Sequence, residues 1–154
     1  MNIERLKMLQ EQVIKAAPSF NMMEWARPWG YMQAEWPETL VTNEPPPCGI
    51  QACLAGETLI MLNIAKVEKC NMIPADDRWD GAQSTIPYLA AEELGLSIEQ
   101  KQRLFYLSKH GHGNGQYYWP VNFELEYNAA KTPLDRAQVA VRRIQHFIDT
   151  NGNE

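Results

Sequence analysis

Cysteine is scarce in this chain of 154 residues, which contains only Cys48, Cys53 and Cys70. A small, odd number of cysteines in a chain of this size argues against a disulfide framework and makes the reducing cytoplasm the expected compartment. Long apolar runs are also lacking, because no stretch approaches the roughly 20 residues of a membrane span. The charged start of the chain lacks the apolar segment of a secretory signal, so we expect neither a signal peptide nor a membrane segment.

Positive charge is not in excess either. Lys and Arg number 14 against 19 Asp and Glu, which gives a formal net charge of -5 with both signs scattered along the chain. Phosphate-driven binding needs a strongly basic face, so we do not expect a nucleic-acid partner. The local basic stripe of Arg136, Arg142 and Arg143 falls on a predicted helix that also carries acids.

The chain does have enough hydrophobic residues, 45% of the total, to bury one core, and residues 1–154 are predicted to form a single domain. Apolar spacing predicts a mainly α fold, with five or six helices around a central buried helix over Gly49–Val67. A loop is predicted over Asn71–Ser84, and a long irregular arm rich in Trp and Pro over Ser19–Pro47. The other predicted helices span residues 3–14, 86–94, 97–108, 119–127 and 134–148.

Capping residues mark several helix ends. Gly95 is placed to end the helix over 86–94. Ser97 and Gln100 have the spacing of a capping box at the start of the next helix. Thr132 followed by Pro133 indicates the start of the last helix. The second half of the chain therefore carries the clearer helix-boundary signals.

A stiff proline run, Pro45–Pro47, delivers Cys48 to the predicted start of the central helix. A thiol at a helix N-terminus meets unpaired N–H groups and the positive end of the helix dipole, and both favour the thiolate. One hypothesis is therefore a small cysteine-dependent hydrolase that uses Cys48 as nucleophile, with His110 or His112 as base and His146 as a further available partner. The alternative is a buried structural thiol, which is the role expected for Cys53 among its apolar neighbours.

A second hypothesis is a structural zinc site. Cys48, Cys53, His110 and His112 have the ligand types of such a site, although the spacing of the two cysteines is not standard. A solvated glycine-rich loop is the competing explanation for the two histidines. We therefore assign no metal ligands and expect no cofactor.

The acidic loop with Asp76, Asp77 and Asp80 offers a third possible ion site. Carboxylates suit calcium or magnesium, but their spacing here does not match an EF-hand. A solvated acidic loop is the preferred interpretation.

Aromatic residues in the arm and the glycine-rich loop favour a binding protein over an enzyme, because loops that carry aromatics often form recognition surfaces. This leading hypothesis predicts that Trp29 and Trp119, among others, are partly exposed and contiguous, with a protein or a small ligand as partner. The apolar stripe Leu6, Leu9 and Val13 fits either a packed core or a homodimer interface. The candidate binding residues are Trp25, Trp29, Trp36, Tyr117 and Trp119.

The segments Cys48-Gly49-x-x-x-Cys53-Leu54-Ala55-Gly56, Trp119-Pro120 and Ala137–Ile148 together resemble a family of small proteins of uncharacterised function in bacteria, plasmids and phages. The resemblance covers roughly two thirds of the chain, from Cys48 onward. It implies an accessory role in a phage or mobile element, and it brings no established activity or catalytic residues. The loop His110–Tyr118 departs from the family pattern by its length.

Overall fold

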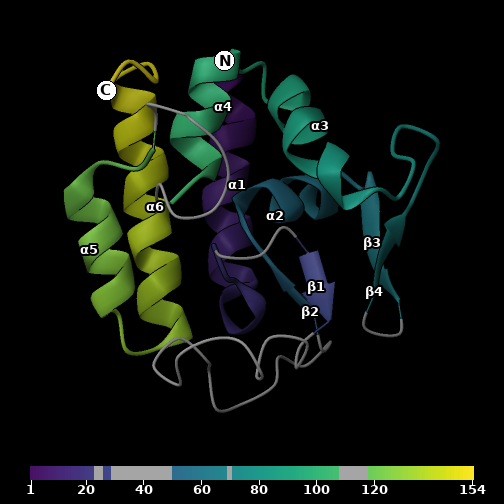
Figure 1. The fold of residues 1–154 in the computed structure, drawn as a ribbon, viewed down its shortest axis with the longest axis horizontal. Helices are drawn as coiled ribbons and strands as arrows, with labels where there is room; N and C mark the ends of the chain where they lie inside the picture. Colours follow the sequence, from purple (N-terminus) through teal and green to yellow (C-terminus); the bar gives the residue numbers. More distant parts are fainter. Residues whose placement is uncertain (23–25, 29–49, 69–70, 108–117) are drawn as a thin grey trace.

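The computed structural model describes residues 1–22, 26–28, 50–68, 71–107 and 118–154. Over these residues the protein is mainly helical, with two small sheets at one side of the helices (Figure 1), so the predicted fold class is confirmed. The helices are α1 (Ile3–Lys15), α2 (Leu54–Met61), α3 (Ile86–Glu93), α4 (Ile98–Phe105), α5 (Val121–Ala129) and α6 (Pro133–Asp149).

Each sheet is a single antiparallel pair of strands. β1 (Ala26–Pro28) pairs with β2 (Ile50–Ala52), and β3 (Ala65–Glu68) pairs with β4 (Asn71–Pro74). The loop predicted over Asn71–Ser84 therefore begins as a strand, because its first four residues complete a hairpin with β3. The short 3-10 helices Ala17–Ser19 and Gln83–Thr85 complete the described elements.

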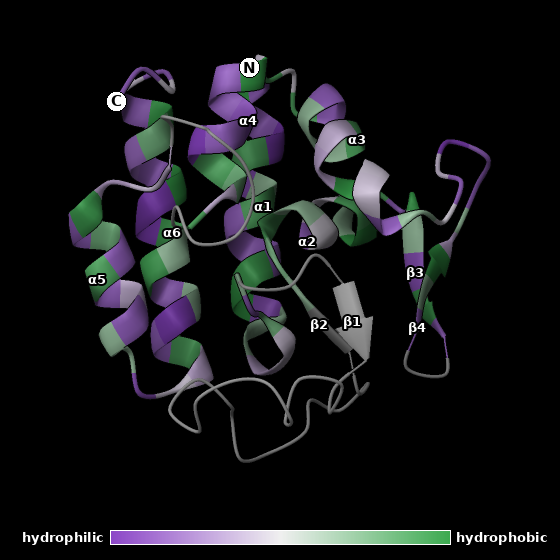
Figure 2. Cartoon of the chain, viewed as in Figure 1, coloured by the Kyte–Doolittle hydropathy of each residue, from purple (hydrophilic) through white to green (hydrophobic). Residues whose placement is uncertain are grey.

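The core is built around α1, which packs against both α6 and α2. α1 and α6 lie side by side, and α5 flanks α6 at the edge of the molecule (Figure 1). Leu6, Leu9 and Val13 of α1 are fully buried against this core. Figure 2 shows the alternation of hydrophobic and hydrophilic residues along both helices, which is typical of helices with one face in the core.

The central buried helix is shorter than the sequence predicts. The predicted helix over Gly49–Val67 is wrong at both ends, because β2 precedes α2 and β3 follows it. α2 ends where Asn63 adopts a left-handed conformation with φ 53°, and the amide of Ile64 then donates to Leu59 O. A continuous apolar run of this kind does not distinguish a buried helix from a buried strand by periodicity, which explains the error.

The predicted capping signals are confirmed. Gly95 has φ 63° at the end of α3, and Ser97 and Gln100 form both hydrogen bonds of a capping box. Thr132 makes the corresponding box with Asp135 at the start of α6. α4 ends at Phe105 rather than near Ser108, because Tyr106 has an extended backbone.

Of the predicted irregular arm over Ser19–Pro47, the structure describes only 19–22 and 26–28. Phe20 and Met22 are buried, and β1 forms the edge of a two-stranded sheet. The rest of that prediction lies outside the described residues.

Candidate functional site

Most of the predicted site residues lie outside the described ranges. The structure places none of the following residues: Cys48, His110, His112, Trp25, Trp29, Trp36 and Tyr117. The hydrolase and zinc hypotheses that depend on them stay predictions. One premise of the hydrolase hypothesis is nevertheless wrong, because the helix that was expected to begin beside Cys48 begins at Leu54.

Cys53 takes the N-cap position of α2. The backbone N–H groups of Ala55 and Gly56 favour its thiolate, as expected for a thiol at a helix N-terminus. Burial dominates, however, and raises the pKa of the Cys53 thiol to about 12. The prediction that Cys53 belongs to the core is confirmed, and this thiol stays protonated near neutral pH.

Glu57, one turn into α2, is the buried acid beside this thiol. Its side chain is 2% exposed, and its Oε2 accepts a hydrogen bond of 2.9 Å from Gln12 Nε2 of α1. Burial raises the pKa of the Glu57 carboxyl to about 7, while the Gln12 contact opposes that rise. A group with this pKa can accept and release protons at neutral pH, but its burial separates it from any bulk substrate.

Trp119 is the one candidate binding aromatic that the structure describes, and the prediction that it is partly exposed is wrong. Its ring is 2% exposed and packs edge-to-face on Tyr127 at 5.8 Å between centroids. Its Nε1 donates a 2.8 Å hydrogen bond to Leu104 O at the end of α4. A buried indole needs a partner for its N–H, and here it finds one by fastening α5 to α4.

The acidic loop is engaged in local hydrogen bonds. Asp76 Oδ2 pairs with Arg78 at 2.6 Å, and the Arg78 hydrogen bond lowers the pKa of that carboxyl. Asp80 Oδ1 accepts from Ala82 N at 2.9 Å and from Thr85 Oγ1 at 3.1 Å. Across the described part of the chain, no group of three or more His, Cys, Asp and Glu side chains is arranged to hold a metal ion.

The predicted basic stripe on α6 is not a surface stripe. Arg142 is exposed and pairs with Glu126 at 2.6 Å, but Arg136 and Arg143 are buried. Arg143 is 0% exposed and packs among the rings of Trp119, Phe123 and Phe147. Burial lowers the pKa of the Arg143 guanidinium.

Glu154 supplies the negative charge for this buried cation. Its carboxylate lies between Arg143 NH2 and His146 Nε2, with a distance of 3.0 Å to the latter. Arg143 NH2 also donates a 2.8 Å hydrogen bond to Arg103 O of α4. The ring of Phe123 lies over His146 at 5.5 Å between centroids, so α5 covers this cluster from outside.

Sequence reasoning missed this cluster, although a signal was present. Arg136, Ala140, Arg143 and Phe147 recur at i, i+4, i+7 and i+11, which is the spacing of a core face. An arginine in that register is either a break in the helix pattern or a buried cation. The partner Glu154 lies beyond the periodic segment, so the helical pattern does not indicate the pairing.

The stripe Leu6, Leu9 and Val13 belongs to the chain's own core, so its interpretation as a homodimer interface is wrong. The large apolar side chains that do face solvent lie elsewhere. Val121 and Leu125 of α5 are 67% and 63% exposed, and Leu134 is exposed at the start of α6. Among the described helices, none is both long and apolar enough to cross a membrane.

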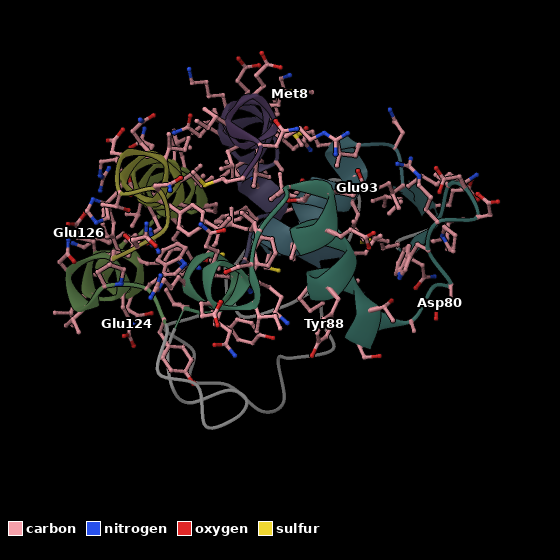
Figure 3. The ribbon with its side chains drawn as sticks, turned by 90° about the horizontal axis from the view of Figure 1, so that it is seen from above. Met8, Asp80, Tyr88, Glu93, Glu124 and Glu126 are labelled. Carbon is pink, nitrogen blue, oxygen red and sulfur yellow. The ribbon has the colours of Figure 1, made fainter. Side chains whose placement is uncertain are left out.

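The outer face of α5 is an apolar stripe with an acid on each side. Val121, Leu125 and Ala129 recur every four residues and therefore share one face. Figure 3, which views α5 nearly end-on, places Glu124 and Glu126 on opposite sides of the helix. Sequence reasoning predicted a helix over 119–127 but did not single out this stripe as a surface.

Comparison of the chain with protein-family models, with curated proteins and with solved structures found no match. The resemblance drawn from the segment that begins at Cys48, and the accessory role that it implies, stay predictions.

Proposed function

We propose that the protein is a non-enzymatic binding protein that docks a basic amphipathic helix of a protein partner on the outer face of α5. The observation that carries this proposal is the exposure of Val121 and Leu125, 67% and 63%, on one helical face. A leucine and a valine buried at an interface each contribute about 1.5–3 kcal/mol of transfer free energy. The proposal rests on this stripe because Trp119, the one candidate aromatic among the described residues, is buried.

The charges beside the stripe select the partner. Glu124 makes no ion pair with a residue that the structure describes, and Glu126 forms an ion pair with Arg142. An acid on each side of an apolar stripe complements a helix whose apolar face is flanked by Lys or Arg. The same acids repel nucleic acid and anionic lipid, which makes a basic protein segment the better occupant.

The described residues favour this role over catalysis. The one thiol that they contain, Cys53, is buried and protonated, and Glu57 is shielded from solvent. Both groups lie in the core, whereas the α5 stripe is open to a macromolecule.

The test uses two synthetic amphipathic helices with the same leucine stripe, one flanked by lysines and the other by glutamates. We expect fluorescence anisotropy to detect binding of the lysine-flanked peptide alone. Leu125→Ser and Val121→Ser should each weaken it about tenfold, because each removes roughly 1.4 kcal/mol or more of apolar burial. Glu124→Lys should weaken the lysine-flanked peptide and strengthen the glutamate-flanked one.

Ile98→Ser is the matched control, because Ile98 is equally exposed but lies on α4. This control should bind the lysine-flanked peptide as the unmodified chain does. The proposal fails if neither peptide binds, or if Ile98→Ser weakens binding as much as Leu125→Ser.

A further inference from the structure

Burial of the Arg143 guanidinium carries a large desolvation free energy that its contacts offset only in part. A guanidinium removed from water needs an opposite charge and acceptors for its five N–H groups. Arg143 is fully buried, and its Nε and NH1 find no acceptor among the residues that the structure describes. Only NH2 is engaged, with Arg103 O and with Glu154.

Glu154 balances the charge of Arg143 but does not form the paired hydrogen bonds that a guanidinium can make to a carboxylate. The carboxylate lies within ion-pair distance of Arg143 and His146, yet neither of its oxygens accepts a well-aligned hydrogen bond from a described residue. Arginine binds carboxylates best through two parallel N–H···O bonds. Glu154 therefore fills this place with a less complete set of contacts than a free carboxylate can make.

We propose that Arg143 and His146 form a binding site for a small aliphatic carboxylate, and that Glu154 occupies this site from within the chain as a competitor. The ligand carries its carboxylate on a short apolar stem, because the rings of Trp119, Phe123 and Phe147 surround the guanidinium. A small molecule fits the burial of the site, since Arg143 and Glu154 are almost inaccessible to a folded partner. The site is independent of the α5 stripe proposed above.

The turn before Glu154 is anchored at Asn151 and Gly152, but the two residues beyond it make few contacts, which is what a displaceable competitor requires. Gln100 Nε2 donates to Asn151 O at 2.9 Å, and Arg103 NH1 donates to Gly152 O. Gly152 N donates to Phe147 O at 2.8 Å. Asn153 N bonds back only to Thr150 O within the same segment. A ligand that takes Arg143 thus displaces the Glu154 carboxylate without unwinding α6.

The test uses propionate, which reproduces the end of the Glu154 side chain, and propionamide as its neutral counterpart. Glu154→Ala should lower Tm by about 5–10 °C, because it leaves a buried cation unpaired. Propionate should then raise the Tm of this variant along a saturable curve, at ionic strength held constant with chloride. Propionamide should leave Tm unchanged.

Competition distinguishes a ligand site from a merely structural ion pair. In the unmodified chain, propionate should need at least about a tenfold higher concentration for half-saturation, because it must displace Glu154. The amide NMR signals of Asn153 and Glu154 should shift along the same curve. Equal half-saturation in both proteins, or immobile Asn153 and Glu154 signals, would overturn the proposal.

Two further variants guard against loss of folding and against surface effects. If Glu154→Ala fails to fold, Glu154→Gln keeps the side-chain volume and removes the charge, and the same propionate curve is expected. Glu126→Gln removes a glutamate from the exposed pair with Arg142 and leaves Glu154 in place, so it should respond to propionate only at the higher concentration that the unmodified chain needs. A response in Glu126→Gln equal to that in Glu154→Gln would mean general salt stabilisation and would refute the site.

Discussion

At the scale of single residues, Glu57 links the interior of the protein to pH. Its carboxyl group is buried at α2, with Gln12 of α1 as its hydrogen-bond donor. Because one neutral donor replaces several waters, the charged form is disfavoured and the pKa rises from 4.5 to about 7. The folded protein therefore holds a proton on Glu57 in a pH range where the unfolded chain has lost it.

This difference in proton binding has a definite sign. Below about pH 4.5 both states are protonated, so Glu57 does not change the free energy of unfolding with pH. Between 4.5 and about 7 the folded state binds more protons, so stability falls as pH rises. The full loss above pH 7 is about 3 kcal/mol, from a shift of roughly 2.5 units at 1.36 kcal/mol each.

Glu57→Gln should remove this dependence, because a neutral amide keeps an acceptor for Gln12 and has no proton to lose. We expect urea unfolding to show that the unmodified chain loses about 2.5 kcal/mol more than the variant between pH 5 and pH 8, because part of the full loss falls below pH 5. Other titrating groups cancel in this difference. Equal losses in the two proteins would show that the carboxyl stays charged in the folded state.

Sequence reasoning at this scale works where the neighbours of a residue dictate its environment. Cys53 lies among Ala52, Leu54 and Ala55, and that context predicted its burial correctly. Glu57 and Arg143 carry charges that sequence assigns to the surface by default, and tertiary packing overrides that default. Trp119 was expected at the surface because a loop precedes it. Its indole is buried instead, because Nε1 donates a hydrogen bond to the Leu104 carbonyl at the end of α4.

At the scale of elements, Trp119 decides how α5 is attached. The last carbonyls of a helix have no partner within it, and Trp119 Nε1 satisfies that of Leu104 in α4. Trp119 N also donates to Tyr106 O at 3.1 Å, so backbone and side chain act together. Pro120 provides no side-chain cap for α5, which makes this attachment more important.

Trp119→Phe should therefore destabilise the protein by about 2 kcal/mol, because it leaves the buried Leu104 carbonyl unpaired and removes part of a packed ring. Tyr88→Phe is the control, since Tyr88 is exposed on α3 and the change should cost less than about 0.5 kcal/mol. Both values come from urea denaturation. A cost for Trp119→Phe as small as that for Tyr88→Phe would mean that α5 is held by its contacts with α6 alone.

Helix boundaries could be predicted where nearby residues in the sequence determine them. Ser97 and Thr132 predicted the starts of α4 and α6, because capping depends on residues three positions apart. The ends of α2 were predicted wrongly, since they depend on the pairing of β2 with β1 and of β3 with β4. Strand pairing joins distant segments, and no local pattern in Gly49–Val67 encodes it.

At the scale of the whole molecule, the turn after α6 joins that helix to α4. Gly152 has φ +65°, and its amide donates to Phe147 O to close the helix. A Cβ placed there would lie 2.9 Å from Phe147 Cζ and 2.9 Å from Gln100 Cγ of α4. The turn therefore needs glycine twice, for its backbone conformation and for its close approach to a neighbouring helix.

Gly152→Ala and Gly81→Ala separate these two requirements. Gly81 also has a positive φ, +84°, but the nearest atom to its added Cβ is Pro74 Cγ at an ordinary 3.5 Å. We expect Gly81→Ala to cost about 1 kcal/mol from backbone strain alone, and Gly152→Ala at least about 1 kcal/mol more. The excess arises because the Phe147 ring that the added Cβ would meet is fully buried and packs beside Arg143. Urea unfolding of both variants gives the comparison, and equal costs would show that α4 and the turn move apart without penalty.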